Sequence, residues 1–251
     1  MMLLQTASRS DDPIRQLKHD LVLGLHILDL EGQGCDIAGH VTSRLPQAET
    51  FWTNRFRLGF DEAAIEELHK VDMDLNVVVG DGKVSPALDL HSAIYKKHNN
   101  VNAIVHTHPL NAVALSTISH NLENVDQQAA PFFKAIGLFD EYHGIFGNGK
   151  GGVEEIATEL SNKRALILRN HGIVVVGKDV REAVVGAILL EKAAAIQLRA
   201  MSAGNINTLP DEAAAEASAS LSKPELFDWR FDYFARRAIR QRKTILKALN
   251  F

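Results

Sequence analysis

Two stretches of sequence decide the fold: VNAIVHTHP at residues 101–109 and RALILRNHGIVVVG at residues 164–177. Both are rich in β-branched and other apolar residues, which favour strands with both faces buried. Asn170-His171-Gly172 divides the second stretch into two short runs, as a tight turn would. We therefore expect three strands here, with histidines at or beside their ends.

Strand and helix patterns interleave along the rest of the chain. Further strands are expected at 40–45 and 51–56, in a hairpin over 68–84, and as short segments over 131–147. Helices are expected at 11–30, 88–98, 109–118, 153–163, 178–204 and 224–249. Asp179 is placed to cap the long fifth helix, and Gly204 lies just past its end. The alanine-rich segment 211–220 reads as either a linker or a helix extension.

This order predicts an α/β protein, specifically an α/β/α three-layer sandwich around a central mixed, mostly antiparallel sheet. We expect one domain over 1–251, with a core at about 15–205 and a helical tail at 222–250. Hydrophobic residues make up 46% of the 251, enough to build a sizeable core.

Composition also excludes several function classes. The net charge is -4, without the basic excess typical of a nucleic-acid partner. The apolar runs are too short to cross a membrane, and the N-terminal one is too short for a secretion signal. Cys35 is the only cysteine, so a metal site must use nitrogen and oxygen ligands; its thiol has no base partner recognisable in the sequence. We expect a cytoplasmic protein.

His106-Thr107-His108 carries the strongest chemical signal. Side chains two apart on a strand point to the same face, so both imidazoles can reach one cation. His171 is the best candidate for a third ligand, because Gly172 beside it allows the backbone to approach closely. Taken alone, this pattern is also compatible with hydrogen-bonded histidines at a strand end and an ordinary turn. His40, His91 and His143 read by default as structural.

Four segments in this order resemble the class II aldolase/adducin family. They are AGHVTSRLP at 38–46, FWTNRFRLGFDEA at 51–63, HSAIYKKHNNVNAIVHTHP at 91–109 and LILRNHGIVVVG at 166–177. The resemblance extends over roughly residues 15–200 and is far more specific than any one segment. It implies a divalent metal, usually zinc with manganese or iron as alternatives, held at His106, His108 and His171. It also implies a homotetramer with active sites between subunits.

The sequence departs from the sugar-phosphate aldolases of that family at their acid/base glutamate. That position is Ala87 here, and a methyl group cannot transfer a proton. Asp89 lies two residues on, where a helix would turn it about 200° away. The family's phosphate-binding Thr-Gly pair becomes Leu58-Gly59, and its usual asparagine falls on His40. A phosphorylated sugar is therefore less expected than the family name suggests.

The resulting hypothesis is a metal-dependent carbon–carbon lyase, an aldolase or a decarboxylase. Its expected substrate is a hydroxy acid, a keto acid or a sugar-like compound. Candidate substrate-binding residues are His40, Asn54, Arg55 and Gly59, and candidate proton-transfer residues are Tyr142 and His143. Two alternatives stay open. One is a non-catalytic adducin-like interaction module, and the other is an iron site with oxygen-dependent chemistry.

Overall fold

The computed structural model describes residues 12–34, 36–144, 146–147 and 150–250; Asp11 and Cys35 lie outside them. Its centre is an eight-stranded sheet of order β4-β3-β2-β1-β5-β8-β7-β6. Neighbouring strands are antiparallel except for the parallel pair β6 and β7. The strands are β1 His40–Ser43, β2 Thr50–Thr53, β3 His69–Asp72, β4 Val77–Val79, β5 Ala103–Thr107, β6 Ile136–Phe139, β7 Ala165–Leu168 and β8 Gly172–Gly177. The predicted mixed, mostly antiparallel sheet is confirmed.

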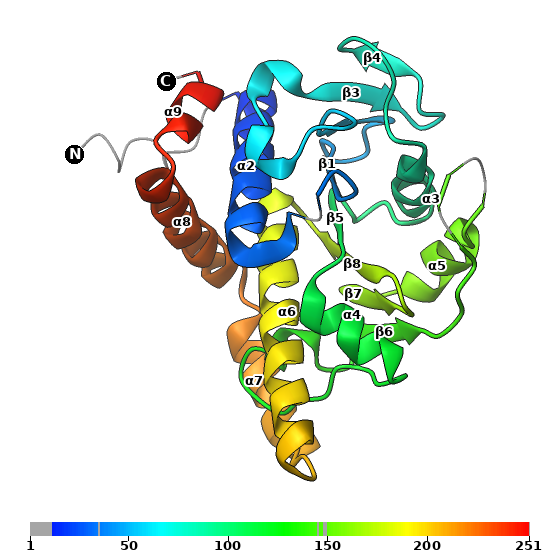
Figure 1. Cartoon of the computed structure of the whole chain (residues 1–251), viewed down its shortest axis with the longest axis vertical. Coiled ribbons are helices and arrows are strands. Elements are labelled where there is room, and N and C mark those ends of the chain that lie inside the picture. The colour runs from blue at the N-terminus through cyan, green and yellow to red at the C-terminus, as the bar shows by residue number, and fades with distance from the viewer. Residues whose placement is uncertain (1–11, 35, 145, 148–149, 251) are drawn as a thin grey trace.

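Helices cover both faces of this sheet and complete the three layers (Figure 1). The longer helices α2 Pro13–Leu28, α6 Val180–Ala203 and α8 Pro224–Gln241 lie on one face with α4 Leu110–Thr117. The opposite face carries α3 Asp89–Lys97 and α5 Val153–Leu160. Two further helices, α7 Asp211–Leu221 and α9 Thr244–Ala248, follow α6 and α8 respectively. Segment 211–220 is thus helical, and the single tail helix expected over 224–249 is divided in two.

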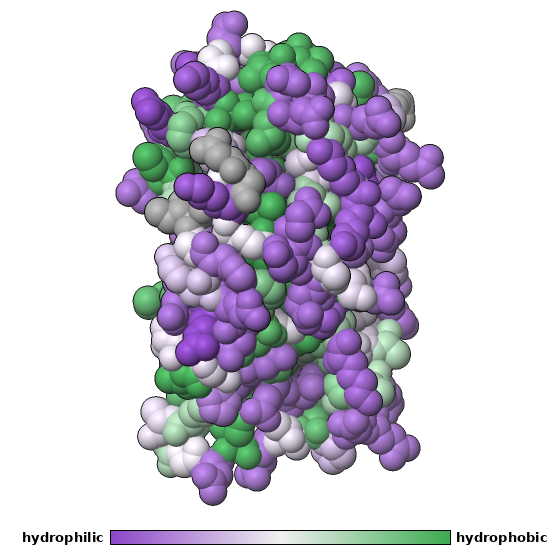
Figure 2. All heavy atoms as spheres, turned by 90° about the vertical axis from the view of Figure 1, so that its right-hand side faces the viewer, coloured by the Kyte–Doolittle hydropathy of each residue, from purple (hydrophilic) through white to green (hydrophobic). Residues whose placement is uncertain are grey.

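Alternation along the strands sorts the core into two clusters. On β5, Ala103 and Val105 face α2 and α6, whereas Ile104 faces α3 and α5. Side chains alternate in this way because successive residues of a strand point to opposite faces. Figure 2 views the molecule from the side of α3 and α5, where hydrophilic residues dominate the surface. These two helices therefore turn their apolar sides inward and their polar sides to solvent.

The C-terminal helices belong to the same packed core as the sheet. Phe227 and Phe231 of α8 and Ile245 of α9 are buried in the cluster that contains α2 and α6. Arg181 of α6 reinforces this packing, with ion pairs of 2.9 Å to Asp20 of α2 and 2.8 Å to Asp232 of α8. The guanidinium is buried, so its carboxylate partners offset the cost of taking the charge out of water.

One predicted capping residue acts as expected, and two predicted element boundaries differ. Asp179 caps α6 by accepting a hydrogen bond from the backbone N–H of Glu182 at 2.9 Å. Pro109 is the residue that precedes α4 rather than its first residue. Strand β2 stops at Thr53, so Asn54 and Arg55 lie in the following loop instead of the predicted strand. None of the described helices is both long and apolar enough to span a bilayer.

The glycine inside α2 provides a test of this packing. A Cβ added at Gly24 would lie 2.9 Å from Cγ2 of Val184 on α6, so α2 and α6 can approach closely only because no side chain separates them. Gly24→Val should lower the free energy of unfolding by about 1–3 kcal/mol, the usual cost of overpacking a filled core. Urea denaturation followed by circular dichroism would measure this change. Arg15→Ala, on the exposed side of the same helix, is the control; equal stability of the two variants would contradict the prediction.

Candidate metal and substrate site

The candidate site is built on β5, which lies inside the sheet between β1 and β8. His106 is the fourth residue of β5 and points to the same face as Ile104, toward α3. Between the two histidines, Thr107 donates a hydrogen bond of 2.8 Å to the buried side chain of Gln33. The end of the strand is therefore anchored from the α2 side while His106 faces the other way.

The turn between β7 and β8 delivers the third histidine. Asn170 has a left-handed backbone conformation with φ of 53°, and the N–H of His171 donates to the carbonyl of Leu168 at 3.1 Å. Gly172 follows, and a Cβ there would overlap the carbonyl oxygen of Thr107 and lie 2.6 Å from Cδ2 of His108. Because Gly172 has no side chain, the turn lies directly against the end of β5.

The structure brings the three histidines together. One ligand nitrogen from each of His106, His108 and His171 lies within 4.8 Å of the other two. The Nε2 atoms of His106 and His108 are 3.2 Å apart. Ligand nitrogens about 2.0–2.1 Å from a tetrahedral zinc would be about 3.4 Å from each other. The three side chains thus need only small adjustments to share one cation.

Their protonation also fits a cation. Nδ1 of His106 lies 2.9 Å from the carbonyl oxygen of Ile173, which can only accept, so Nδ1 carries the hydrogen and Nε2 keeps its lone pair. Metal-binding histidines commonly show this arrangement, with the second nitrogen donating to a carbonyl or carboxylate. Burial lowers the pKa of His108, and it lowers the pKa of His171 to about 4 with a further contribution from His108. Both rings are therefore neutral at physiological pH.

Further aromatic rings surround this cluster. Phe146 packs against His171 and His106, with ring centroids 4.5 and 5.4 Å away. His40 is paired with His106 across β1 and β5, and the two rings stack at 6.2 Å. His91 of α3 meets the edge of His40 at 6.1 Å. Phe146 carries no sequence signal, because an apolar residue in a glycine-rich loop has no distinctive pattern.

Tyr142 and His143 lie beside the cluster. Both border a narrow hollow that is also lined by His171, Phe146 and Arg169. Tyr142 is 59% exposed, and Nε2 of His143 lies 2.8 Å from a carboxylate oxygen of Glu141. The two side chains predicted to transfer a proton are therefore near the three histidines and reachable from solvent.

The other predicted substrate-binding residues already have protein partners. The side-chain oxygen of Asn54 accepts from the N–H of Val41 at 3.1 Å, and its amide lies 3.4 Å from the carbonyl of Gly39. Asn54 thus holds the backbone on both sides of His40. Arg55 is ion-paired with Glu67. The N–H of Gly59 donates to Glu62 at 2.8 Å.

The segment around Ala87 differs from the helix considered above. Pro86–Leu88 form a 3-10 turn, and α3 begins only at Asp89. Oδ1 of Asp89 accepts from the N–H of Leu90 at 2.8 Å, so this carboxylate caps its own helix. That bond supports the view that Asp89 is a poor replacement for the missing glutamate.

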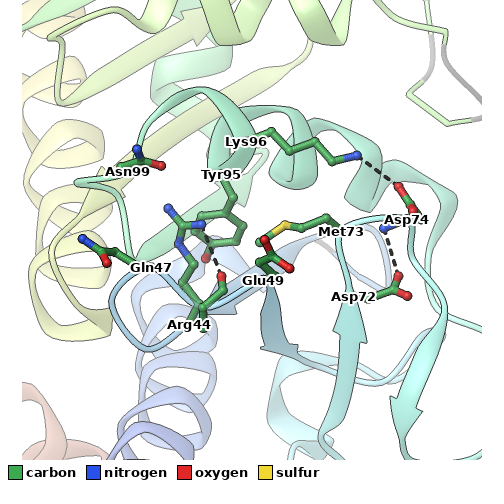
Figure 3. A pocket seen from close by; sticks show the side chains of 10 residues that line it. Arg44, Gln47, Glu49, Asp72, Met73, Asp74, Tyr95, Lys96 and Asn99 are labelled. Carbon is green, nitrogen blue, oxygen red and sulfur yellow. Dashed lines mark hydrogen bonds and ion pairs between the residues drawn. The ribbon is translucent and has the colours of Figure 1, made fainter.

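A larger cleft, of about 770 Å³, lies at the far end of β1, where Arg44 follows the strand (Figure 3). Its polar groups largely bond to the protein itself. Arg44 donates to the carbonyls of Val101 and His98 at 3.0 and 3.1 Å, and Lys96 pairs with Asp74 at 3.2 Å. We therefore place the candidate site at the three histidines despite their smaller hollow.

Comparisons with known proteins identify the family to which this fold belongs. The family model "Class II Aldolase and Adducin N-terminal domain" matches residues 20–198. A "4-hydroxy-3-prenylphenylpyruvate oxygenase/4-hydroxy-3-prenylbenzoate synthase" of Streptomyces roseochromogenus subsp. oscitans is 31% identical over 77% of this chain and 70% of its own. "Decarboxylase NovR" of Streptomyces niveus is also 31% identical, over 77% of this chain and 72% of its own. The solved structure of an L-fuculose 1-phosphate aldolase from Glaciozyma antarctica PI12 superposes with a TM-score of 0.82 and 27% identity, covering 96% of this chain and 97% of that one.

The buried imidazoles predict how stability depends on pH. Burial lowers the pKa of His40 to about 4, and that of His171 to about 4. An unfolded histidine takes up its proton near pH 6.5. Between these values the unfolded chain binds more protons, so the free energy of unfolding of chelator-treated protein should fall as the pH drops from 7 to 5.

Urea unfolding of His40→Asn at the two pH values would isolate the contribution of the His40 imidazole to this pH dependence. Between pH 7 and pH 5, we expect the free energy of unfolding to fall by about 2 kcal/mol less in the variant than in the parent protein. His120→Asn, which changes an exposed histidine, should keep the parent's dependence. A parent protein whose stability is the same at both pH values would contradict the prediction.

Proposed function

We infer that this chain, which belongs to the class II aldolase and adducin family, is a metal-dependent carbon–carbon lyase of aldolase or decarboxylase type. The observation that carries this proposal is the convergence of three imidazole nitrogens from two separate stretches of the chain, the end of β5 and the β7–β8 turn. At least one of them, Nε2 of His106, carries a lone pair, because Nδ1 of that ring donates to the carbonyl of Ile173. Three such rings would be costly to bury together without a shared partner.

His106, His108 and His171 would hold the metal, and the lone cysteine, Cys35, lies outside the described residues. Neutral imidazoles suit zinc and iron well, whereas manganese generally prefers oxygen ligands. A divalent cation in such a site acts as a Lewis acid for a carbonyl oxygen. Three protein ligands leave room for a substrate, which is the arrangement of catalytic rather than structural zinc.

The surrounding residues favour a substrate with hydroxyl and carboxylate or keto oxygens. Leu58 and Pro86 stand where phosphate-binding relatives supply hydroxyl or backbone donors, so the residues present offer a phosphate dianion little. His40 supplies an imidazole next to His106, and Asn54 holds the backbone on both sides of His40. Arg55 and Gly59 would contribute only after exchanging their bonds to Glu67 and Glu62 for bonds to substrate.

Tyr142 and His143 are the proposed proton-transfer residues. They border the same hollow as His171. They would take over proton transfer from the family's glutamate, whose position is occupied here by Ala87. His143 is paired with Glu141, a contact that orients its ring beside the hollow. The exposure of Tyr142 also fits our further proposal of a homotetramer, in which a neighbouring subunit would cover the site.

Metal analysis of purified protein tests the proposal. We expect about one equivalent of zinc, manganese or iron per chain, and His108→Ala should lose it while remaining folded. Tyr142→Phe and His143→Asn should keep full metal content but lose lyase turnover, and His120→Ala should keep both. Folded protein without metal would sink the proposal and favour the adducin-like interaction module instead. Unchanged metal in His108→Ala would remove that residue from the site.

A second candidate is an iron-dependent oxygenase, which the name of the Streptomyces roseochromogenus relative favours. The small side chain of Ala87 leaves open the position that a glutamate occupies in aldolases of the family. Iron with three histidines and free positions suits oxygen chemistry. An oxygen electrode distinguishes the two candidates with 4-hydroxyphenylpyruvate as the probe. Oxygen uptake by iron-loaded but not zinc-loaded protein would establish the oxygenase, and turnover of keto acids under nitrogen by zinc-loaded protein would establish the lyase.

A further inference from the structure

Helix α4 begins two residues after His108, and its first turn is held by a carboxylate from another helix. Oε1 of Glu191 on α6 accepts from the backbone N–H of Asn111 at 2.9 Å and from its side-chain amide at 2.6 Å. Oε2 accepts from the N–H of Ala112 at 2.9 Å. The residue before the helix, Pro109, has no side-chain oxygen to cap it. Glu191 therefore supplies the acceptors that a capping residue would normally provide.

The last turn of α4 contacts the turn that carries His171. The hydroxyl of Ser116, which is fully buried, donates to the carbonyl of Val113 within α4 at 2.7 Å. The same oxygen accepts from the backbone N–H of Asn170 at 3.0 Å. Asn170 immediately precedes His171, and its left-handed backbone forms the turn. One short helix thus contacts the chain beside two of the three clustered histidines.

The middle of α4 is packed tightly between these two contacts. Ala112 and Leu115 are fully buried, in the same hydrophobic cluster as Ile173 of β8 and Leu190 of α6. Figure 1 shows α4 beside α6 and next to β7. Protein interiors are close-packed and transmit small displacements, so a shift at the first turn of α4 is expected to reach its last turn.

We propose that α4 is a clamp that sets the separation between His108 and His171. Glu191 and Ser116 are the positioning residues that hold its two ends. His106 needs no such device, because it lies within β5 and is held by pairing with β1 and β8. His108 and His171 lie just outside β5 and β8, where these strand ladders end. The effect of the clamp on a bound cation rests on the proposed function.

Amide hydrogen exchange of chelator-treated protein, followed by NMR, tests the clamp without any cation. Glu191→Ala should speed exchange about tenfold at Asn111 and Ala112, which lose a hydrogen bond to a charged group. Exchange at Asn170 should rise about threefold, because its bond to Ser116 is weakened although Glu191 does not bond to it. Unchanged exchange at Asn170 would reduce Glu191 to a local cap and overturn the proposal.

Gln197 provides a matched control on the same helix. It is fully buried, and its side chain accepts from the N–H of Glu123 at 2.8 Å and donates to the carbonyl of Asn121 at 3.0 Å. It therefore holds a neighbouring segment by bonds of the same kind, but that segment carries none of the clustered histidines. Gln197→Ala should lower stability without speeding exchange at Asn170.

Two adjacent hydroxyls on α4 distinguish the clamp from general helix stability. Ser116 and Thr117 each donate to the carbonyl three residues earlier at 2.7 Å, but of the two only Ser116 also bonds to Asn170. Competition with a chelator should show about tenfold lower zinc affinity in Ser116→Ala than in the parent protein, and unchanged affinity in Thr117→Ala. Equal affinities in these two variants would exclude Ser116 from the clamp.

Graded variants of Glu191 give a further readout of the same effect. Glu191→Gln keeps one of the two accepting oxygens, so its zinc affinity should fall between those of the parent protein and Glu191→Ala. The visible spectrum of cobalt-loaded protein reports ligand geometry, and it should change in Glu191→Ala and stay unchanged in Gln197→Ala. Identical spectra in the parent protein and Glu191→Ala would contradict a positioning role for Glu191.

The same variants separate this inference from the proposed function. Parent protein that takes up no zinc, with faster exchange at Asn170 in Glu191→Ala, would leave the clamp standing and remove the metal-dependent lyase. Zinc bound with equal affinity by the parent protein, Glu191→Ala and Ser116→Ala would leave the proposed metal site standing and overturn the clamp.

Discussion

The contact between the β7–β8 turn and the end of β5 is the constraint on which the candidate site depends. Antiparallel pairing places Thr107 opposite Ile173, so the residue just before β8 lies over the residues just after β5. Gly172 has no side chain, and its backbone rests against the carbonyl of Thr107. A larger residue would push the turn away and separate His171 from His106 and His108.

This placement also determines the electrostatics of the site. Burial lowers the pKa of five neighbouring histidines, and a nearby imidazole lowers it further at each of them except His108. All five therefore keep a neutral ring with one lone pair and one hydrogen. One ring nitrogen from each of His106, His108 and His171 lies within 4.8 Å of the other two, and His106 directs its hydrogen to the carbonyl of Ile173.

Much of the fold could be predicted from local pattern. The β-branched runs of β5, β7 and β8 and the capping residue Asp179 gave elements close to those observed. The predicted end of β2 and the predicted single tail helix were both wrong. Both α8 and α9 pack against α2, a tertiary contact that the local sequence does not indicate. Strand geometry was enough to predict that His106 and His108 point to one face. The prediction of His171 as the third ligand also depended on the turn and on the family resemblance. The hydroxyl of Thr42 lies 2.8 Å from both Tyr95 and His91, and because these residues are far from Thr42 in the chain, no local pattern could indicate the contacts.

The outer strand β4 has a consequence for how the protein behaves at high concentration. It contains three residues, of which Val78 and Val79 are exposed, and its pairing with β3 is interrupted by a register shift at Lys70 and Val71. An open sheet edge can recruit another chain into a continuous ladder, and long flat apolar edges are the usual starting point of aggregates. Here the edge is too short and too irregular to serve as such a template. The two valines can therefore remain in water without making the molecule prone to fibril-like self-association.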